Sequence, residues 1–201
     1  MSEFLIYLKI GYQHITDLNG FDHLLFLLAL CAIYSLQQWK EVLLLVTAFT
    51  LGHSITLALA TQEIIEVDSD LIEFLIPVTI IITCLVNFFH RFRKSIYNSP
   101  KRGKWLRYIL AVVFGLVHGL GFSNYLKGLL GSENSILKPL FAFNIGLELG
   151  QILIVAVALM VNFLLISGFN VKKKTWNLIL SGTVLGMSLM LIIDSIKDYF
   201  V

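Results

Sequence analysis

Residues 139–167 read PLFAFNIGLELGQILIVAVALMVNFLLIS, an apolar run whose one charged residue is Glu148. A helix needs about 20 residues to cross the bilayer core of about 30 Å, so this run is long enough to span it. Pro139 suits the first turn of such a helix, where the N–H that proline lacks has no intrahelical partner to lose. The run therefore predicts a membrane-spanning helix.

The composition extends this reading to the whole chain. Of its 201 residues, 57% are hydrophobic and 14% are charged, and the mean hydropathy is +0.83. Soluble domains carry about 25% charged residues, so one water-soluble core of this size cannot bury the excess of apolar side chains. We expect an all-α polytopic membrane protein, with residues 1–201 forming a single transmembrane domain. About six helices are predicted, over residues 20–36, 40–61, 71–92, 105–125, 139–167 and 175–196.

The charged loops predict the orientation. Basic residues gather in three loops that alternate with acidic or mixed ones such as 63–70. They are Lys40, then Arg91, Arg93, Lys94, Lys101, Arg102, Lys104 and Arg107, then Lys172, Lys173 and Lys174. The positive-inside rule places these loops in the cytoplasm and both termini outside. Since topology accounts for the basic residues, no nucleic-acid partner is expected. Residues 3–18 are amphipathic and are predicted to lie in the membrane interface.

Pro77 falls inside the predicted helix 71–92. A proline within a membrane helix frees a backbone carbonyl one turn earlier, and neighbouring groups must then satisfy it. We also expect a kink at this position.

Polar side chains within the predicted helices gather at one level, toward the outer side of the membrane. They come from four helices and comprise Asp22, His23, His53, Ser54, His118 and Glu148. A charged residue costs about 2.5–3.5 kcal/mol in the membrane centre, so such groups pair, line a watery cavity or bind an ion. Imidazoles suit nickel, zinc, copper or iron. The pattern predicts a site for a divalent transition metal, with His14 just outside it as a possible cap.

The predicted helix 139–167 carries a further polar face. Asn144, Glu148 and Gln151 recur at i, i+4 and i+7 and so share one side of the helix. We expect Asn144 and Gln151 to support the site as interhelical hydrogen-bond partners. Glycine pairs four residues apart predict close helix packing. They are Gly115 and Gly119, Gly146 and Gly150, and Gly182 and Gly186.

Four motifs together resemble the HupE/UreJ family of small membrane proteins, most closely its second subgroup. They are GYQHITDLNGFDHLLF at 11–26, FTLGHS at 49–54, HGLGF at 118–122 and FNIGLELGQ at 143–151. The resemblance covers most of the chain. It implies a nickel or cobalt permease in a bacterial inner membrane, with His14, Asp22 and His23 taking part in metal recognition.

Three functions remain open from the residues. A permease would pass nickel, cobalt or a similar ion inward, and Asn87 is its strong polar candidate in the inner half. A resident zinc would instead activate water in an intramembrane hydrolase of lipid or peptide, with Glu148 or Asp22 as general base. That reading superficially resembles the alkaline ceramidase and adiponectin-receptor group. A metal sensor or assembly partner is the third possibility. We expect a transporter rather than an enzyme, and leave the oligomeric state open.

Overall fold

The computed structural model describes residues 2–18, 20–90, 101–130 and 136–200, and these form helices without any strand. Residues 91–100, which hold part of the predicted basic loop, lie outside the described ranges. The helices are α1 Glu3–Thr16, α2 Asp22–Cys31, η1 Leu36–Gln38, α3 Trp39–Thr61, α4 Ser69–Phe88, α5 Lys101–Gly121, α6 Ser123–Leu130, α7 Leu137–Phe163, the π-helical turn η3 Leu164–Gly168 and α8 Lys173–Phe200.

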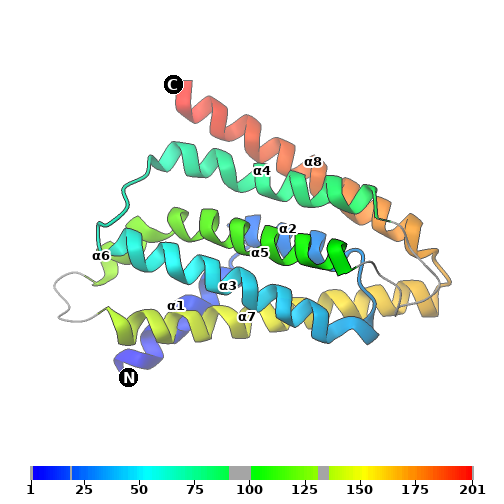
Figure 1. Cartoon of the computed structure of the whole chain (residues 1–201), viewed down its shortest axis with the longest axis horizontal. Helices are drawn as coiled ribbons and strands as arrows, with labels where there is room; N and C mark the ends of the chain where they lie inside the picture. Colours follow the sequence, from blue (N-terminus) through cyan, green and yellow to red (C-terminus); the bar gives the residue numbers. More distant parts are fainter. Residues whose placement is uncertain (1, 19, 91–100, 131–135, 201) are drawn as a thin grey trace.

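The long helices α3, α4, α5 and α7 run side by side along the long axis of the molecule (Figure 1). The most extensive packing joins α3 to α5, α1 to α7, and α4 to α8. Among the described residues, four helices are long and apolar enough to cross a membrane, and a fifth span results if α5 and α6 count as one. The all-α polytopic membrane fold is therefore confirmed, whereas the count of six spans and their orientation stay predictions.

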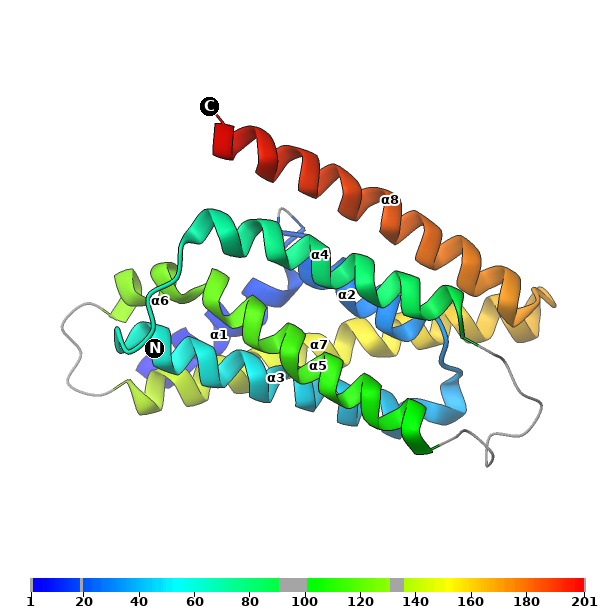
Figure 2. The same ribbon diagram turned by 45° about the horizontal axis from the view of Figure 1, so that its top comes forward.

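The first predicted span, residues 20–36, is replaced by a shorter helix. Helix α2 has ten residues, or about 15 Å at 1.5 Å per residue, which is half of what the bilayer core requires. Residues 3–18 also differ from the expected interfacial segment, because α1 packs along α7. Gly11 makes this contact: a Cβ there would collide with the carbonyl of Phe143. Helix α1 lies toward one end of the bundle and α2 runs toward the other (Figures 1 and 2).

The C-terminal end of α2 is stabilised by buried amides from other helices. The last carbonyl groups of a helix have no partner within it, and a helix that ends inside a membrane protein must find one elsewhere. Asn87 of α4 donates to the carbonyl of Ala29 at 2.7 Å, and Asn162 of α7 donates to that of Cys31 at 2.9 Å. Asn87, expected on a polar route, therefore serves here as a helix cap.

The other points at which the sequence predictions can be compared with the structure lie in α5, α4 and α8. The predicted helix 105–125 is bent by 50° where α5 gives way to α6. Helix α4 continues through Pro77, and the carbonyl of Glu73 that this proline frees lies 3.3 Å from Ser195 Oγ of α8. This confirms that a neighbouring group satisfies the freed carbonyl. Gly182 and Gly186 of α8 face open space in the monomer instead of a packed helix.

Candidate metal-binding site

Four histidines from four helices converge inside the bundle. They are His14 on α1, His23 on α2, His53 on α3 and His118 on α5. In each ring Nε2 is buried and has no hydrogen-bond partner among the described residues. His53 and His118 are almost fully buried, at 0% and 1% exposure, and both ring nitrogens of His53 lack a partner. Buried polar atoms are normally hydrogen-bonded, so four such nitrogens in one place indicate a ligand site.

The spacing of the rings suits one metal ion. Ligand nitrogens of His14, His23 and His53 all lie within 4.8 Å of one another. Zinc lies 2.0–2.1 Å from a histidine nitrogen, so two nitrogens on one ion are separated by at most about 4.2 Å. Small side-chain rotations would bring the three nitrogens from within 4.8 Å to the separation that one ion requires. The donor set of imidazoles fits nickel, cobalt or zinc better than magnesium or calcium, which prefer oxygen ligands.

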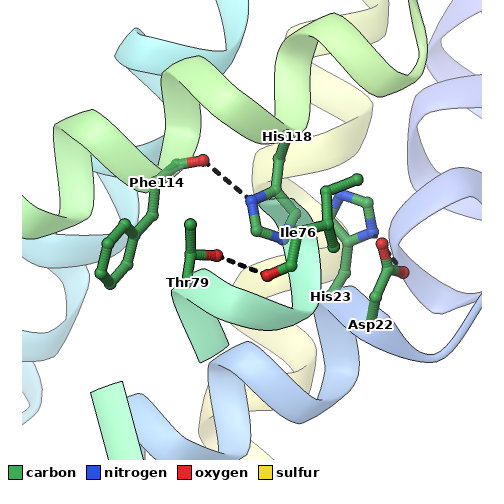
Figure 3. Close-up of polar contacts among 6 residues, drawn as sticks. All are labelled: Asp22, His23, Ile76, Thr79, Phe114 and His118. Carbon is green, nitrogen blue, oxygen red and sulfur yellow. Dashed lines mark hydrogen bonds and ion pairs between the residues drawn. The ribbon is translucent and has the colours of Figure 1, made fainter. Parts of the chain in front are cut away.

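The neighbours of His118 and His23 orient both rings (Figure 3). Nδ1 of His118 lies 2.8 Å from the Phe114 carbonyl, and Nδ1 of His23 lies 3.0 Å from Asp22 Oδ1. Since both partners are acceptors, each Nδ1 carries the hydrogen and each Nε2 keeps its lone pair for a metal. The two ring centroids are 5.1 Å apart. A carboxylate behind a metal-binding histidine is a common second layer of support, and Asp22 lies in that position relative to His23.

Glycines bring the histidine-bearing helices together. Helices α3 and α5 touch at Gly115, where a Cβ would collide with the Phe49 carbonyl, and at Gly119, where it would collide with the carbonyl of His53. These two glycines flank His118 in the sequence. The close approach of the two backbones therefore sets the distance between His53 and His118, and the packing predicted for this glycine pair is confirmed.

A pocket adjoins the histidines between the C-terminal half of α1 and the start of α6. This pocket of about 710 Å³ is lined by α1, α6 and their adjoining loops, and His14 forms part of its wall. The ring of Phe122 lies over His14 with centroids 3.9 Å apart, and it also stacks on Phe143 at 5.1 Å. Phe122 lies at the bend between α5 and α6, so it covers the histidines from the pocket side.

Aromatic rings close the opposite side of the histidines. His118 lies 5.2 Å from Phe49 and 5.8 Å from Phe26, and these two phenylalanines stack on each other at 4.8 Å. Beyond Phe26 and Phe114 lies a cavity of about 40 Å³. Arg107 and Tyr34 line the same cavity, with Arg107 Nη1 donating to Tyr34 Oη at 3.1 Å.

Glu148, a predicted ligand, forms a hydrogen bond away from the histidine rings. Its Oε1 accepts from Thr47 Oγ1 at 2.8 Å, and the ligand atoms within 4.8 Å of one another belong to His14, His23 and His53, so that Glu148, Asp22 and His118 lie outside this group. Gln151 of the same face pairs with Thr50 at 2.7 Å. Ser54 donates to the carbonyl of Thr50 at 2.6 Å, a helix-backbone contact. Asn144 Oδ1 is buried without a partner among the described residues.

Thr47 was missed by the sequence reasoning, as was Asn162. Asn162 interrupts an apolar run in the sequence, and that interruption is the signal that could have identified it. Thr47 carries no such signal, because a threonine within a membrane helix commonly bonds to its own backbone.

Comparison with known proteins gives one match. Residues 1–195 match the family model described as HupE / UreJ protein, which is nearly the full chain. No curated protein and no solved structure matches.

Proposed function

Since the chain belongs to the HupE/UreJ family, we propose that it is a permease for a divalent transition-metal ion of the nickel or cobalt type. His14, His23, His53 and His118 would bind the ion, and Asp22 would orient His23. The observation that carries this proposal is the convergence of four buried Nε2 atoms without partners. The protein would work in the lipid bilayer of a bacterial inner membrane, as a multi-pass protein with both termini outside.

The break between α1 and α2 supports binding of a cation at this level. The C-terminal end of a helix carries a partial negative charge and the N-terminal end a partial positive one. His14 lies in the last turn of α1, where a cation is favoured, and Asp22 opens α2, where a carboxylate is favoured. Transporters commonly bind their substrates at such interrupted helices near the middle of the membrane.

The surroundings of the histidines support a transport route. The ion would enter through the pocket beside His14 and exchange its water for imidazole nitrogens. Phe122 covers the site on the pocket side, while Phe26 and Phe49 separate it from the cavity near Arg107. Movement of these two aromatic layers in turn would expose the site first to one end of the bundle and then to the other.

The hydrolase alternative gains no support from these contacts. Both candidate general bases are engaged, Asp22 with His23 and Glu148 with Thr47.

Removal of single histidines tests the site. His53→Ala and His118→Ala in the full chain should each lower nickel or cobalt binding at least tenfold and abolish uptake into sealed proteoliposomes. His90→Ala is the matched control, because His90 lies next to Arg107 and away from the cluster. Uptake and binding at the wild-type level in both site variants would refute the assignment, as would equal losses in the control.

A further inference from the structure

The carboxylate of Glu148 lies on the side of α7 and α3 that faces away from the interior of the bundle. Thr47, its hydrogen-bond partner, is exposed, and Glu148 itself is half-buried. Leu44 and Leu51 flank Thr47 on α3 and are 60% and 59% exposed. Leu149 follows Glu148 on α7 and is 49% exposed. The carboxylate thus lies on an apolar surface of the kind that contacts lipid.

An ionised carboxylate is costly in such a place, and the protonated acid is much less so. One threonine hydroxyl is the hydrogen-bond partner that the described residues give to Glu148. Two oxygen-bearing side chains cannot replace the six or more oxygens that a hard metal cation requires. The proton is therefore the ligand that this group can bind.

Near Glu148, the hydrogen-bonded pair of Gln151 and Thr50 extends the polar contacts toward His53. Gln151 is one turn away on α7, fully buried, and its Nε2 has no partner among the described residues. Its Oε1 accepts from Thr50, which lies one turn from His53 on α3. Titratable groups on the helices packed against α7 include Tyr12 and His14 on α1, Asp22 and His23 on α2, and His53 on α3. Within the described ranges none of these forms a hydrogen bond or ion pair with Glu148.

We propose that Glu148 is a proton-binding site whose protonation and deprotonation accompany each cycle of metal movement. The coupling rests on the proposed permease function. The step is balanced by itself, because the carboxylate gains one proton to become the acid and releases the same proton later. A protonated Glu148 keeps its hydrogen bond to Thr47 at little cost in lipid. The ionised form needs the Thr47 hydroxyl and the nearby Gln151–Thr50 pair to stabilise its charge.

The first experiment uses dicyclohexylcarbodiimide, an apolar reagent that attacks protonated carboxyl groups within membranes. The full chain, in vesicles of phosphatidylethanolamine and phosphatidylglycerol, should gain one adduct by intact mass spectrometry. The adduct should be absent in Glu148→Gln and present in Glu73→Gln, a control on α4. Labelling should decline as the pH rises, and Thr47→Val should alter its extent because the carboxyl group loses its hydrogen-bond partner. No adduct, or an adduct that persists in Glu148→Gln, would overturn the proposal.

The second experiment tests coupling in the same vesicles. Glu148→Gln should bind nickel within twofold of wild type, yet lose at least tenfold of the uptake that a pH gradient drives. Wild-type uptake that does not depend on the pH gradient would overturn the proposed coupling, whereas the proposed permease function would stand. Wild-type protein that moves no metal would refute the permease and the coupling together, while labelling would still report whether Glu148 binds a proton.

Discussion

Asp22 combines two roles at the residue scale: it begins α2 and accepts a hydrogen bond from His23. Asp22→Asn removes the negative charge that holds the hydrogen on His23 Nδ1 and favours the cation. Loss of such second-layer support typically lowers metal affinity 10–100-fold, and we expect this range for nickel. Calorimetric titration of the detergent-purified protein measures it. Asp194→Asn on α8 is the control, and a change below twofold in Asp22→Asn would contradict the assigned role.

His90 lies just beyond α4, where Arg107 Nη2 is 2.8 Å from its Nδ1. Burial, and then the positive charge of Arg107, lower the pKa of His90 from 6.5 to about 4. The neutral ring therefore accepts from Arg107 at neutral pH. The native state binds fewer protons than the unfolded chain between pH 4 and 6.5, so stability should fall as the pH is lowered through that window.

The pKa of His90 can be followed by NMR of protein labelled at histidine. Arg107→Gln should raise that pKa toward 6.5, although burial alone keeps it below the ordinary value. An unchanged pKa in this variant would show that Arg107 does not act on His90.

The proximity of the histidines could be predicted from the sequence. Membrane-embedded histidines are costly alone, so the prediction that His23, His53 and His118 meet followed from depth and chemistry. Glu148 was grouped with them by depth alone, which does not specify direction around the helix axis. It lies five residues from Phe143, whose ring faces His53, and five residues turn a helix by about 140°. Glu148 therefore points toward Thr47 and away from the histidines.

At the scale of elements, the contact between α3 and α5 depends on missing side chains. A Cβ at Gly115 would meet the Phe49 carbonyl and the backbone nitrogen of His53, and backbone atoms cannot rotate aside. Gly115→Ala should destabilise the protein by about 1–3 kcal/mol through overpacking and weaken metal binding by separating the histidines. Thermal unfolding in detergent and nickel titration measure the two effects.

Gly182 on α8 provides the matched control, since a Cβ there meets nothing within 4 Å. Gly182→Ala should leave metal binding unchanged and stabilise the helix by about 0.5–1 kcal/mol. Equal stability and binding in the two alanine variants would show that α3 and α5 tolerate separation.

The elements also divide into those the sequence could predict and those it could not. Residues 39–61 and 69–88 follow the predicted helices closely, because long apolar runs have a single stable form in a bilayer. The interrupted α1 and α2 could not be foreseen. Neither segment is long enough to span alone, and their stability comes from distant partners such as Phe143 and Asn87.

The orientation of the whole molecule decides which side of the membrane reaches the histidines first. The pocket beside His14 lies between α1 and α6, toward the end of the bundle that holds the N-terminus and the start of α4 (Figure 1). The opposite end holds Lys40 and Lys173, and the positive-inside rule assigns basic loops to the cytoplasm. With this orientation the pocket lies on the outer side of the membrane, which is consistent with the proposed uptake of metal.

Single introduced cysteines test the orientation in intact cells with a membrane-impermeant maleimide. The native Cys31 and Cys84 are buried, so they should give little background. Ser2→Cys and Asp68→Cys should react in intact cells, whereas Lys173→Cys should react only after lysis. The reverse pattern would place His14 and its pocket on the cytoplasmic side and contradict the predicted orientation.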